Sequence, residues 1–175
     1  MAPDLKTLIR SIPDFPKAGI MFRDISTLLK DPAGLSAAVD WIVDQYKAEE
    51  VDAVAGIESR GFILGGVVAH ELGTGFIPMR KPGKLPAETV KAAYELEYGT
   101  DSLEMHIDAI STGQRVLVVD DLLATGGTAR AAVELVEKLG GTVLGPVFLI
   151  ELTFLDGRSR LKGRDIRSLI QYDSE

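Results

Sequence analysis

The chain has 175 residues, of which 46% are hydrophobic, and this size suits one domain built around a single core. Its net charge of −7 excludes a protein that binds nucleic acid through a broad basic surface, because phosphate binding needs an excess of Lys and Arg. The absence of cysteine excludes disulfide bonds and thiolate metal sites, and it is compatible with a reducing compartment.

The sequence carries no pattern typical of export or membrane insertion. Residues 1–11 include the acidic Asp4 and no long apolar run, so they do not resemble a secretory signal. The longest apolar stretches are interrupted well short of the roughly 20 residues that span a bilayer. We therefore expect a soluble, cytoplasmic protein that binds no membrane.

Helical spacing of apolar residues predicts two helices near the N-terminus. The first is short: it covers residues 5–12 behind the capping residue Asp4 and ends at Pro13. The second begins after the capping residue Asp31, with Pro32 at the first helical position. Its apolar face, which should pack on a sheet, consists of Leu35, Ala38, Val39, Ile42, Val43 and Tyr46.

Apolar, β-branched runs then predict four buried strands, at residues 51–57, 75–79, 116–119 and 142–152. Helical patterns lie between them at 62–72 and 132–139, and each is closed by glycine. Alternating strands and helices imply a parallel sheet. We therefore predict an α/β fold, with residues 1–175 forming a single domain around a central, mostly parallel β-sheet flanked by helices.

The segment between the second and third predicted strands interrupts this alternation. Residues 94–107 alternate apolar and polar side chains, with Gly99-Thr100-Asp101 as a turn, which indicates a hairpin. Loop 80–86 precedes it and holds a local excess of positive charge. We expect hairpin and loop to form a hood, with the loop a mobile flap that closes over an anionic leaving group. An ordinary exposed basic loop is the alternative.

The most informative segment joins the strand at 116–119 to the helix that follows. Asp120 and Asp121 come directly after the strand, and the loop before the helix consists of Ala124, Thr125, Gly126, Gly127 and Thr128. Ligands of open α/β sheets collect at the carboxyl ends of strands, where such a loop presents N–H groups, hydroxyls and a helix N-terminus to a phosphate. Ionised carboxylates just upstream are strong acceptors for sugar hydroxyls. The order therefore predicts a site for ribose 5-phosphate.

Other phosphate-binding motifs fit this segment poorly. There is no Gly-Lys-Ser/Thr ending of a P-loop and no Gly-x-Gly-x-x-Gly after a strand. For residues 125–128 taken alone, a turn that merely connects strand and helix is the alternative reading, with Thr128 as a helix cap.

The complete order of residues 116–128 resembles the signature of the phosphoribosyltransferase family. The resemblance covers nearly the whole chain and is closest to the adenine phosphoribosyltransferases, in the segments 15–16, 22–26, 56–62, 80–86 and 94–99. It implies the type I phosphoribosyltransferase fold and a Mg²⁺-dependent, reversible reaction. In that reaction adenine and phosphoribosyl pyrophosphate give AMP and pyrophosphate, a purine-salvage step usually carried out by homodimers.

The resemblance also implies how the leaving group is bound. Glu58, Ser59 and Arg60 would form a pyrophosphate loop, and Lys81 and Lys84 would add positive charge from the flap. Mg²⁺ would be held mainly by substrate oxygens and water, so no direct protein ligands for the metal are expected. Alone, Arg60 could equally be a solvated loop residue.

Three catalytic residues follow from the same resemblance. Arg80 can reach the site of a neighbouring subunit in the family, while Glu97 and Tyr98 would cover the reacting centre. Glu97 would handle a proton on adenine as its N9 attacks the ribose carbon, which a carboxylate can do if desolvation raises its pKa. An ordinary exposed glutamate on a strand is the alternative.

For the base, the resemblance implies binding by Met21, Phe22 and Arg23. Phe22 would stack on adenine, and the backbone of its two neighbours would recognise the edge of the ring. Stacking suits any purine, so selectivity for a 6-amino group requires an acceptor such as a main-chain carbonyl. Phe22 as ordinary core packing is the alternative.

Two other functions stay open at this point. One is a phosphoribosyltransferase for 6-oxopurines (hypoxanthine, guanine or xanthine). The other is a non-catalytic regulator that senses phosphoribosyl pyrophosphate and binds DNA, although such proteins normally carry an added DNA-binding segment. We assign no role to residues 157–175, whose basic side chains we expect to be solvated: Arg158, Arg160, Lys162, Arg164 and Arg167.

Overall fold

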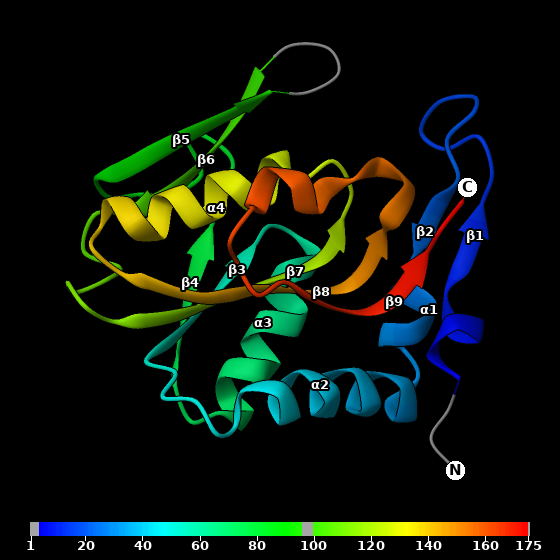
Figure 1. The fold of residues 1–175 in the computed structure, drawn as a ribbon, viewed down its shortest axis with the longest axis horizontal. Helices are drawn as coiled ribbons and strands as arrows, with labels where there is room; N and C mark the ends of the chain where they lie inside the picture. The colour runs from blue at the N-terminus through cyan, green and yellow to red at the C-terminus, as the bar shows by residue number, and fades with distance from the viewer. Residues whose placement is uncertain (1–3, 96–99, 175) are drawn as a thin grey trace.

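The computed structural model describes residues 4–95 and 100–174, and a five-stranded sheet forms its centre (Figure 1). All neighbouring strands of this sheet are parallel. In spatial order they are β4 (Gly75–Met79), β3 (Ala53–Ile57), β7 (Arg115–Leu123), β8 (Thr142–Leu152) and β9 (Arg167–Tyr172). The predicted α/β fold with a parallel sheet is confirmed.

The central strands are buried on both faces, as their continuous apolar runs predict. Every residue of β3 is buried, and so are seven of the nine residues of β7. Strand β3 begins two residues later than expected, whereas β7 extends at both ends beyond the predicted residues 116–119. Strand β7 therefore includes Asp120 and Asp121, which we expected just beyond its end.

Helices cover both faces of the sheet (Figure 1). On one face, α2 (Pro32–Tyr46) and α3 (Arg60–Glu71) pack with alternate residues of β3 and β7 in one apolar cluster. On the other face, α4 (Gly127–Lys138) packs on the remaining alternate residues of the same strands. Helix α2 starts as predicted, because the Asp31 carboxylate accepts a hydrogen bond from the Gly34 N–H at 2.7 Å. The short helix α1 (Ser26–Leu29) precedes it.

The N-terminal helix predicted for residues 5–12 is wrong beyond its first turn. Only η1 (Leu5–Leu8), a 3-10 helix, forms there, and Arg10–Ile12 instead is a strand, β1. This strand pairs antiparallel with β2 (Phe22–Asp24). Backbone pairing with a distant segment outweighs the weak helical preference of so short a sequence.

The predicted hairpin is confirmed and is longer than expected. Strands β5 (Thr89–Glu95) and β6 (Thr100–His106) pair antiparallel, and the buried Leu103 and Met105 pack on α4. Of the expected turn, Thr100 and Asp101 belong to β6, while Gly99 lies outside the described residues.

The loop 80–86 is attached to this hairpin. The backbone N–H of Arg80 donates to the Glu104 carbonyl at 3.0 Å, and the Glu104 N–H donates back at 2.7 Å. The Gly83 N–H donates to the Glu104 carboxylate at 3.0 Å. These bonds attach the loop to β6 of the hairpin, so loop and hairpin together form the predicted hood.

The C-terminal region, to which we assigned no role from the sequence, forms regular elements. Two 3-10 helices, η2 (Thr153–Leu155) and η3 (Gly157–Leu161), lead into β9, which completes the sheet. Among the described residues, no helix has both the length and the apolar character needed to cross a membrane.

Candidate active site

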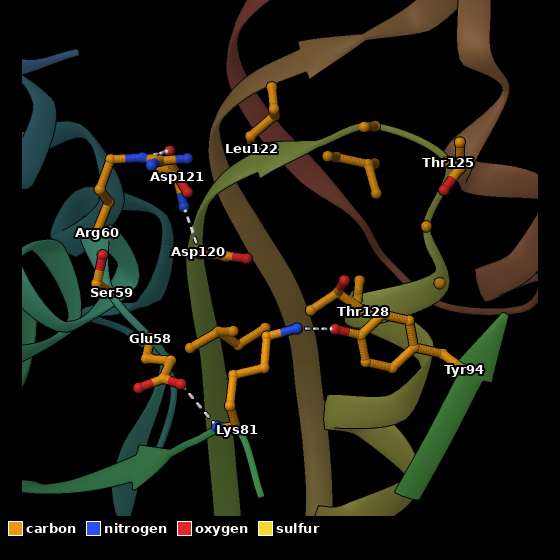
Figure 2. A pocket seen from close by; sticks show the side chains of 16 residues that line it. Glu58, Ser59, Arg60, Lys81, Tyr94, Asp120, Asp121, Leu122, Thr125 and Thr128 are labelled. Carbon is orange, nitrogen blue, oxygen red and sulfur yellow. Dashed lines mark hydrogen bonds and ion pairs between the residues drawn. The ribbon is translucent and has the colours of Figure 1, made fainter. Parts of the chain in front are cut away.

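A cavity of about 360 Å³ opens where β3 and β7 end and where α3 and α4 begin. Eleven of the residues singled out in the sequence line it, and Figure 2 shows their side chains. They are Glu58, Ser59, Arg60, Lys81, Asp120, Asp121, Ala124, Thr125, Gly126, Gly127 and Thr128. Two strand-to-helix connections that are about 60 residues apart in the sequence thus face one cavity, as expected at the carboxyl edge of a parallel sheet.

The first connection runs from β7 to α4. Gly126 adopts a left-handed conformation with φ of +81°, which favours glycine, and α4 begins at the next residue. Because Gly126 has no side chain, it cannot cap the helix, and the N–H groups of the first turn are available to a ligand. Thr125 and Thr128 point from this loop toward the same space in Figure 2. The connection therefore has the geometry of an anion site at a helix N-terminus.

The two aspartates of β7 differ in their electrostatic surroundings. Asp120 is buried, and this burial together with the neighbouring Asp121 carboxylate raises the pKa of Asp120 well above its ordinary value of 3.8. Asp121 instead forms an ion pair with Arg60, whose Nε lies 2.5 Å from the Asp121 Oδ2. Arg60 thereby links the start of α3 to the end of β7 on one side of the cavity (Figure 2).

The second connection, from β3 to α3, is tied to the loop that follows β4. The Glu58 carboxylate accepts hydrogen bonds from the Lys81 N–H at 2.8 Å and from the Arg80 Nε at 3.1 Å. Burial alone would raise the pKa of Glu58, but these two donors outweigh it and lower that pKa. Glu58 therefore stays ionised and fixes the start of the loop over this end of the cavity.

The basic residues of this loop take different positions. The Lys81 ammonium group reaches into the cavity and contacts the Tyr94 hydroxyl and the Asp101 carboxylate of the hairpin. Arg80 and Lys84 do not belong to the cavity lining, and the Arg80 Nη1 donates to the Lys84 carbonyl at 3.1 Å. Of the three basic residues of this loop, only Lys81 lines the cavity, together with Arg60 from the start of α3.

The three residues expected to bind the base lie beside the cavity rather than in its lining. The Phe22 ring is 5.6 Å from the Arg60 guanidinium carbon and packs edge-on against Phe15 at 5.0 Å. Met21 lines a separate cavity of about 220 Å³. The Arg23 guanidinium stacks 4.0 Å from the centre of the Tyr172 ring.

Some residues of the cavity lining were not expected from the sequence. Tyr94, Ile57, Leu122, Leu123 and Ala129 line the cavity without having been singled out. The position of Tyr94 on the hairpin was a usable signal, because the hairpin was already expected above the site. Glu97 and Tyr98 lie outside the described residues.

Comparison with known proteins agrees with this geometry. Residues 24–167 match the family model of the phosphoribosyl transferase domain. An adenine phosphoribosyltransferase of Solibacter usitatus is 62% identical over 171 residues, which cover 98% of this chain and 99% of that relative.

Solved structures give the same result. The adenine phosphoribosyltransferase of Thermoanaerobacter pseudethanolicus is 54% identical and superposes with a TM-score of 0.95, covering 98% of this chain and all of that one. The enzyme of Saccharomyces cerevisiae, solved with an iminoaltritol bisphosphate and adenine, is 42% identical with a TM-score of 0.87, covering 97% of each chain. The chain therefore belongs to the phosphoribosyltransferase family, and within it to the adenine phosphoribosyltransferases.

Proposed function

We propose that this chain transfers the 5-phosphoribosyl group from phosphoribosyl pyrophosphate to adenine, forming AMP and pyrophosphate, in the cavity of Figure 2. One observation carries the proposal: the Asp120–Thr128 segment and the Glu58–Arg60 segment face the same cavity. A substrate with a phosphate at one end and a pyrophosphate at the other needs two anion sites separated by a sugar site. The relatives' names identify the acceptor base as adenine and do not support the 6-oxopurine alternative.

In this proposal the 5-phosphate binds at the loop 124–128. The first N–H groups of α4, together with the hydroxyls of Thr125 and Thr128, would donate hydrogen bonds to its oxygens. The positive end of the α4 dipole would also stabilise the anion. The ribose hydroxyls would then lie against Asp120 and Asp121, one sugar length toward β3.

The pyrophosphate group binds at the opposite end of the cavity. Ser59, the backbone of the β3–α3 connection, Arg60 and Lys81 supply the donors and cations there. The ion pairs that Arg60 and Lys81 form with Asp121 and Asp101 hold both cations at the rim. Lys84 and Arg80 would approach only through a movement of the loop, which we predict to close over the substrate.

Adenine stacks on Phe22 in this arrangement. The contact of Phe22 with the Arg60 guanidinium places its ring next to the cavity, on the side of the ribose aspartates. Met21 and Arg23, on either side of Phe22, would recognise the edge of the base through hydrogen bonds of their backbone groups. A main-chain carbonyl that accepts from the 6-amino group would select adenine over 6-oxopurines.

The chemistry is a displacement in which pyrophosphate departs and the N9 atom of adenine bonds to the anomeric carbon of the ribose. The bond to pyrophosphate breaks early, so positive charge develops on the ribose and negative charge on the leaving group, where Arg60 and Lys81 stabilise it. Glu97 would hold the proton of adenine, and Tyr98 would help to exclude water. Positioning of the two reactants supplies much of the rate enhancement.

Mg²⁺ fits this site as a metal carried in with the substrate. Among the described residues, no group of three His, Cys, Asp or Glu side chains forms a metal cage. A hard cation that keeps water and phosphate oxygens as ligands needs no such cage. When bound, Mg²⁺ would neutralise charge on the pyrophosphate, while Asp120 and Asp121 act on the ribose hydroxyls.

A homodimer and a cytoplasmic location complete the proposal. The homodimer rests on resemblance to the family. The cytoplasmic location rests on the sequence, whose lack of cysteine is compatible with a reducing compartment. In this structure Arg80 pairs with Glu58 of its own chain, so its proposed role in a neighbouring site requires that this ion pair opens.

The test is an assay of AMP formation from adenine and phosphoribosyl pyrophosphate with Mg²⁺. Hypoxanthine, guanine and xanthine serve as parallel substrates, and pyrophosphate release is measured for each base. We expect turnover with adenine and a kcat/KM at least about 100-fold lower with each 6-oxopurine, because a mismatched polar group leaves buried partners unpaired. Equal turnover with hypoxanthine would refute the assignment of the base, and no turnover with any base would refute the proposed reaction.

A further inference from the structure

The 3-10 helix η3 packs directly against the back of the loop proposed to bind the 5-phosphate. A Cβ atom added to Gly126 would lie 2.3 Å from the Gly157 carbonyl oxygen. One added to Gly157 would lie 2.2 Å from the Ala124 carbonyl oxygen. Both separations are far below a normal van der Waals contact, so at this point two backbones touch without a side chain between them. The position of the loop therefore depends on the position of Gly157.

Gly157 is in turn held by the residue that follows it. The Arg158 guanidinium forms two parallel bonds with the Glu151 carboxylate, from Nε to Oε1 at 2.6 Å and from Nη2 to Oε2 at 2.7 Å. A third bond runs from the Arg158 Nη1 to the Ile166 carbonyl at 2.9 Å. Two-point pairing fixes a guanidinium in orientation as well as in distance. Arg158 therefore cannot move without breaking several bonds at once.

The acceptor of these bonds belongs to the sheet. Glu151 lies near the end of β8, is only 3% exposed, and also accepts a hydrogen bond from the Ser168 hydroxyl of β9 at 2.5 Å. The far end of η3 is held by Leu161, which is buried in an apolar cluster with Leu123 and Phe148. Thus η3 is attached to the sheet by an ion pair at one end and by apolar packing at the other. The Arg158 side chain is 43% exposed, as we expected for this region, although it is also paired with Glu151. The expectation is wrong for Arg164 and Arg167, whose side chains are partly buried.

We infer that Glu151, Arg158 and Gly157 are positioning residues for the 5-phosphate of the substrate: the Glu151–Arg158 pair holds Gly157 against Ala124 and Gly126 and so sets the loop. This inference rests on the proposed function, which assigns the 5-phosphate to that loop. The pyrophosphate end is built differently, because Glu58, Ser59 and Arg60 belong to the connection of β3 and α3. A change in η3 should therefore affect one end of the substrate and spare the other.

The first test is Gly157→Ala, with binding measured by calorimetry for ribose 5-phosphate and, separately, for inorganic pyrophosphate with Mg²⁺. The added methyl group pushes directly on the Ala124 carbonyl. We expect the Kd for ribose 5-phosphate to rise about tenfold or more, since an error of an ångström in position can cost about 100-fold. The Kd for pyrophosphate should stay within about twofold of the wild-type value. Gly75→Ala is the matched control, because a Cβ there meets nothing within 4 Å.

The second test is Arg158→Lys, which keeps the charge beside Glu151 but loses the two-point geometry. We expect the KM for phosphoribosyl pyrophosphate to rise and the KM for adenine to stay unchanged, with the same preferential loss of ribose 5-phosphate binding. Arg164→Lys is its control: Arg164 pairs with Glu137 at 2.5 Å in the same region, but Glu137 is 49% exposed. That variant should behave as the wild type.

Equal weakening of both ligands in the two η3 variants would overturn the inference, because it would indicate general destabilisation. Unchanged binding of both ligands would overturn it as well. If Gly157→Ala does not fold, Arg158→Lys is the deciding variant. The ratio of its Kd for ribose 5-phosphate to its Kd for pyrophosphate then tests the inference. Failure of the proposed function is a distinct result, since the wild-type chain itself would then not bind ribose 5-phosphate.

Discussion

Two adjacent aspartates of β7 meet different surroundings because successive side chains of a strand point to opposite faces. Asp120 lies buried next to α3, where the loss of water raises the pKa of its carboxyl group. Asp121 faces Arg60 and is paired with it. A pair of acids that looks uniform in the sequence therefore consists of one buried carboxyl group with a raised pKa and one carboxylate held in an ion pair.

The first prediction concerns this pair. The double variant Asp120→Asn/Asp121→Asn should raise the Kd for phosphoribosyl pyrophosphate about 100-fold, or about 2.8 kcal/mol, since each factor of ten corresponds to about 1.4 kcal/mol. Calorimetry with Mg²⁺ present measures the change. Asp44→Asn, which removes an exposed partner of Lys47, is the control and should bind normally. Wild-type affinity in the double variant would show that the ribose lies elsewhere.

The second prediction concerns Glu97, whose role comes from resemblance alone. Glu97→Gln should lower kcat by about 100-fold to 10,000-fold, the usual contribution of a positioned acid or base, and leave the KM values nearly unchanged. Steady-state rates at saturating adenine and phosphoribosyl pyrophosphate give kcat, and their dependence on each substrate concentration gives the KM values. The exposed Glu71→Gln should have normal rates. A normal kcat in Glu97→Gln would remove this residue from the chemistry.

Among the elements, the close approach of α3 to β7 shapes the cavity. A Cβ added to Gly61 would lie 2.8 Å from the Asp120 Oδ1 and 3.0 Å from the Val119 carbonyl oxygen. The first turn of α3 can therefore touch the strand only because residue 61 has no side chain. This contact brings the β3–α3 connection close enough to face the β7–α4 loop across one cavity.

The third prediction compares two glycines of this helix. Gly61→Ala should lower the free energy of unfolding by about 1 to 3 kcal/mol through overpacking, and weaken phosphoribosyl pyrophosphate binding by displacing Asp120. Gly66→Ala, where a Cβ meets nothing within 4 Å, should raise stability by up to about 1 kcal/mol, the difference in helix propensity. Urea denaturation at neutral pH measures both. A stable Gly61→Ala chain with normal binding would contradict the role given to this contact.

In the proposed binding mode the substrate lies between separate parts of the fold. Its 5-phosphate end contacts β7 and α4 and its pyrophosphate end contacts β3 and α3, with α3 and α4 on opposite faces of the sheet (Figure 1). A bound substrate therefore connects both helical layers. The native state alone offers this arrangement, so substrate binding and folding are thermodynamically linked.

The fourth prediction follows from this linkage. Phosphoribosyl pyrophosphate with Mg²⁺ at about 100 times its Kd should stabilise the chain by about 2.7 kcal/mol. For a chain of this length, that corresponds to a rise in Tm of about 5 to 11 °C. Calorimetric scans with and without the ligand measure the change in Tm. The ligand-free sample contains sodium chloride to match the ionic strength. An unchanged Tm would contradict binding at the cavity.

Much of the fold could be predicted because the signals are local. The apolar runs of β3, β4, β7 and β8 are continuous, and α2 carries both a capping aspartate and a proline at its start. The site could be predicted in part for the same reason, since the loop 124–128 is one uninterrupted segment. Strands β1, β2 and β9 were not predicted, because their sequences mix charged or polar residues with apolar ones and form no continuous apolar run; their pairing with distant partners decides that they are strands.

The sequence by itself determined that strands and helices alternate, that two polar, glycine-containing connections follow strands, and which family the motifs resemble. These properties depend on residues that are neighbours in the chain. Only the tertiary structure decided that Arg60 pairs with Asp121, that Lys81 contacts Tyr94 of the hairpin, and that η3 packs against the loop 124–128. These contacts join residues brought together by the packing of strands and helices, so their partners appear only when the sheet and its layers are assembled.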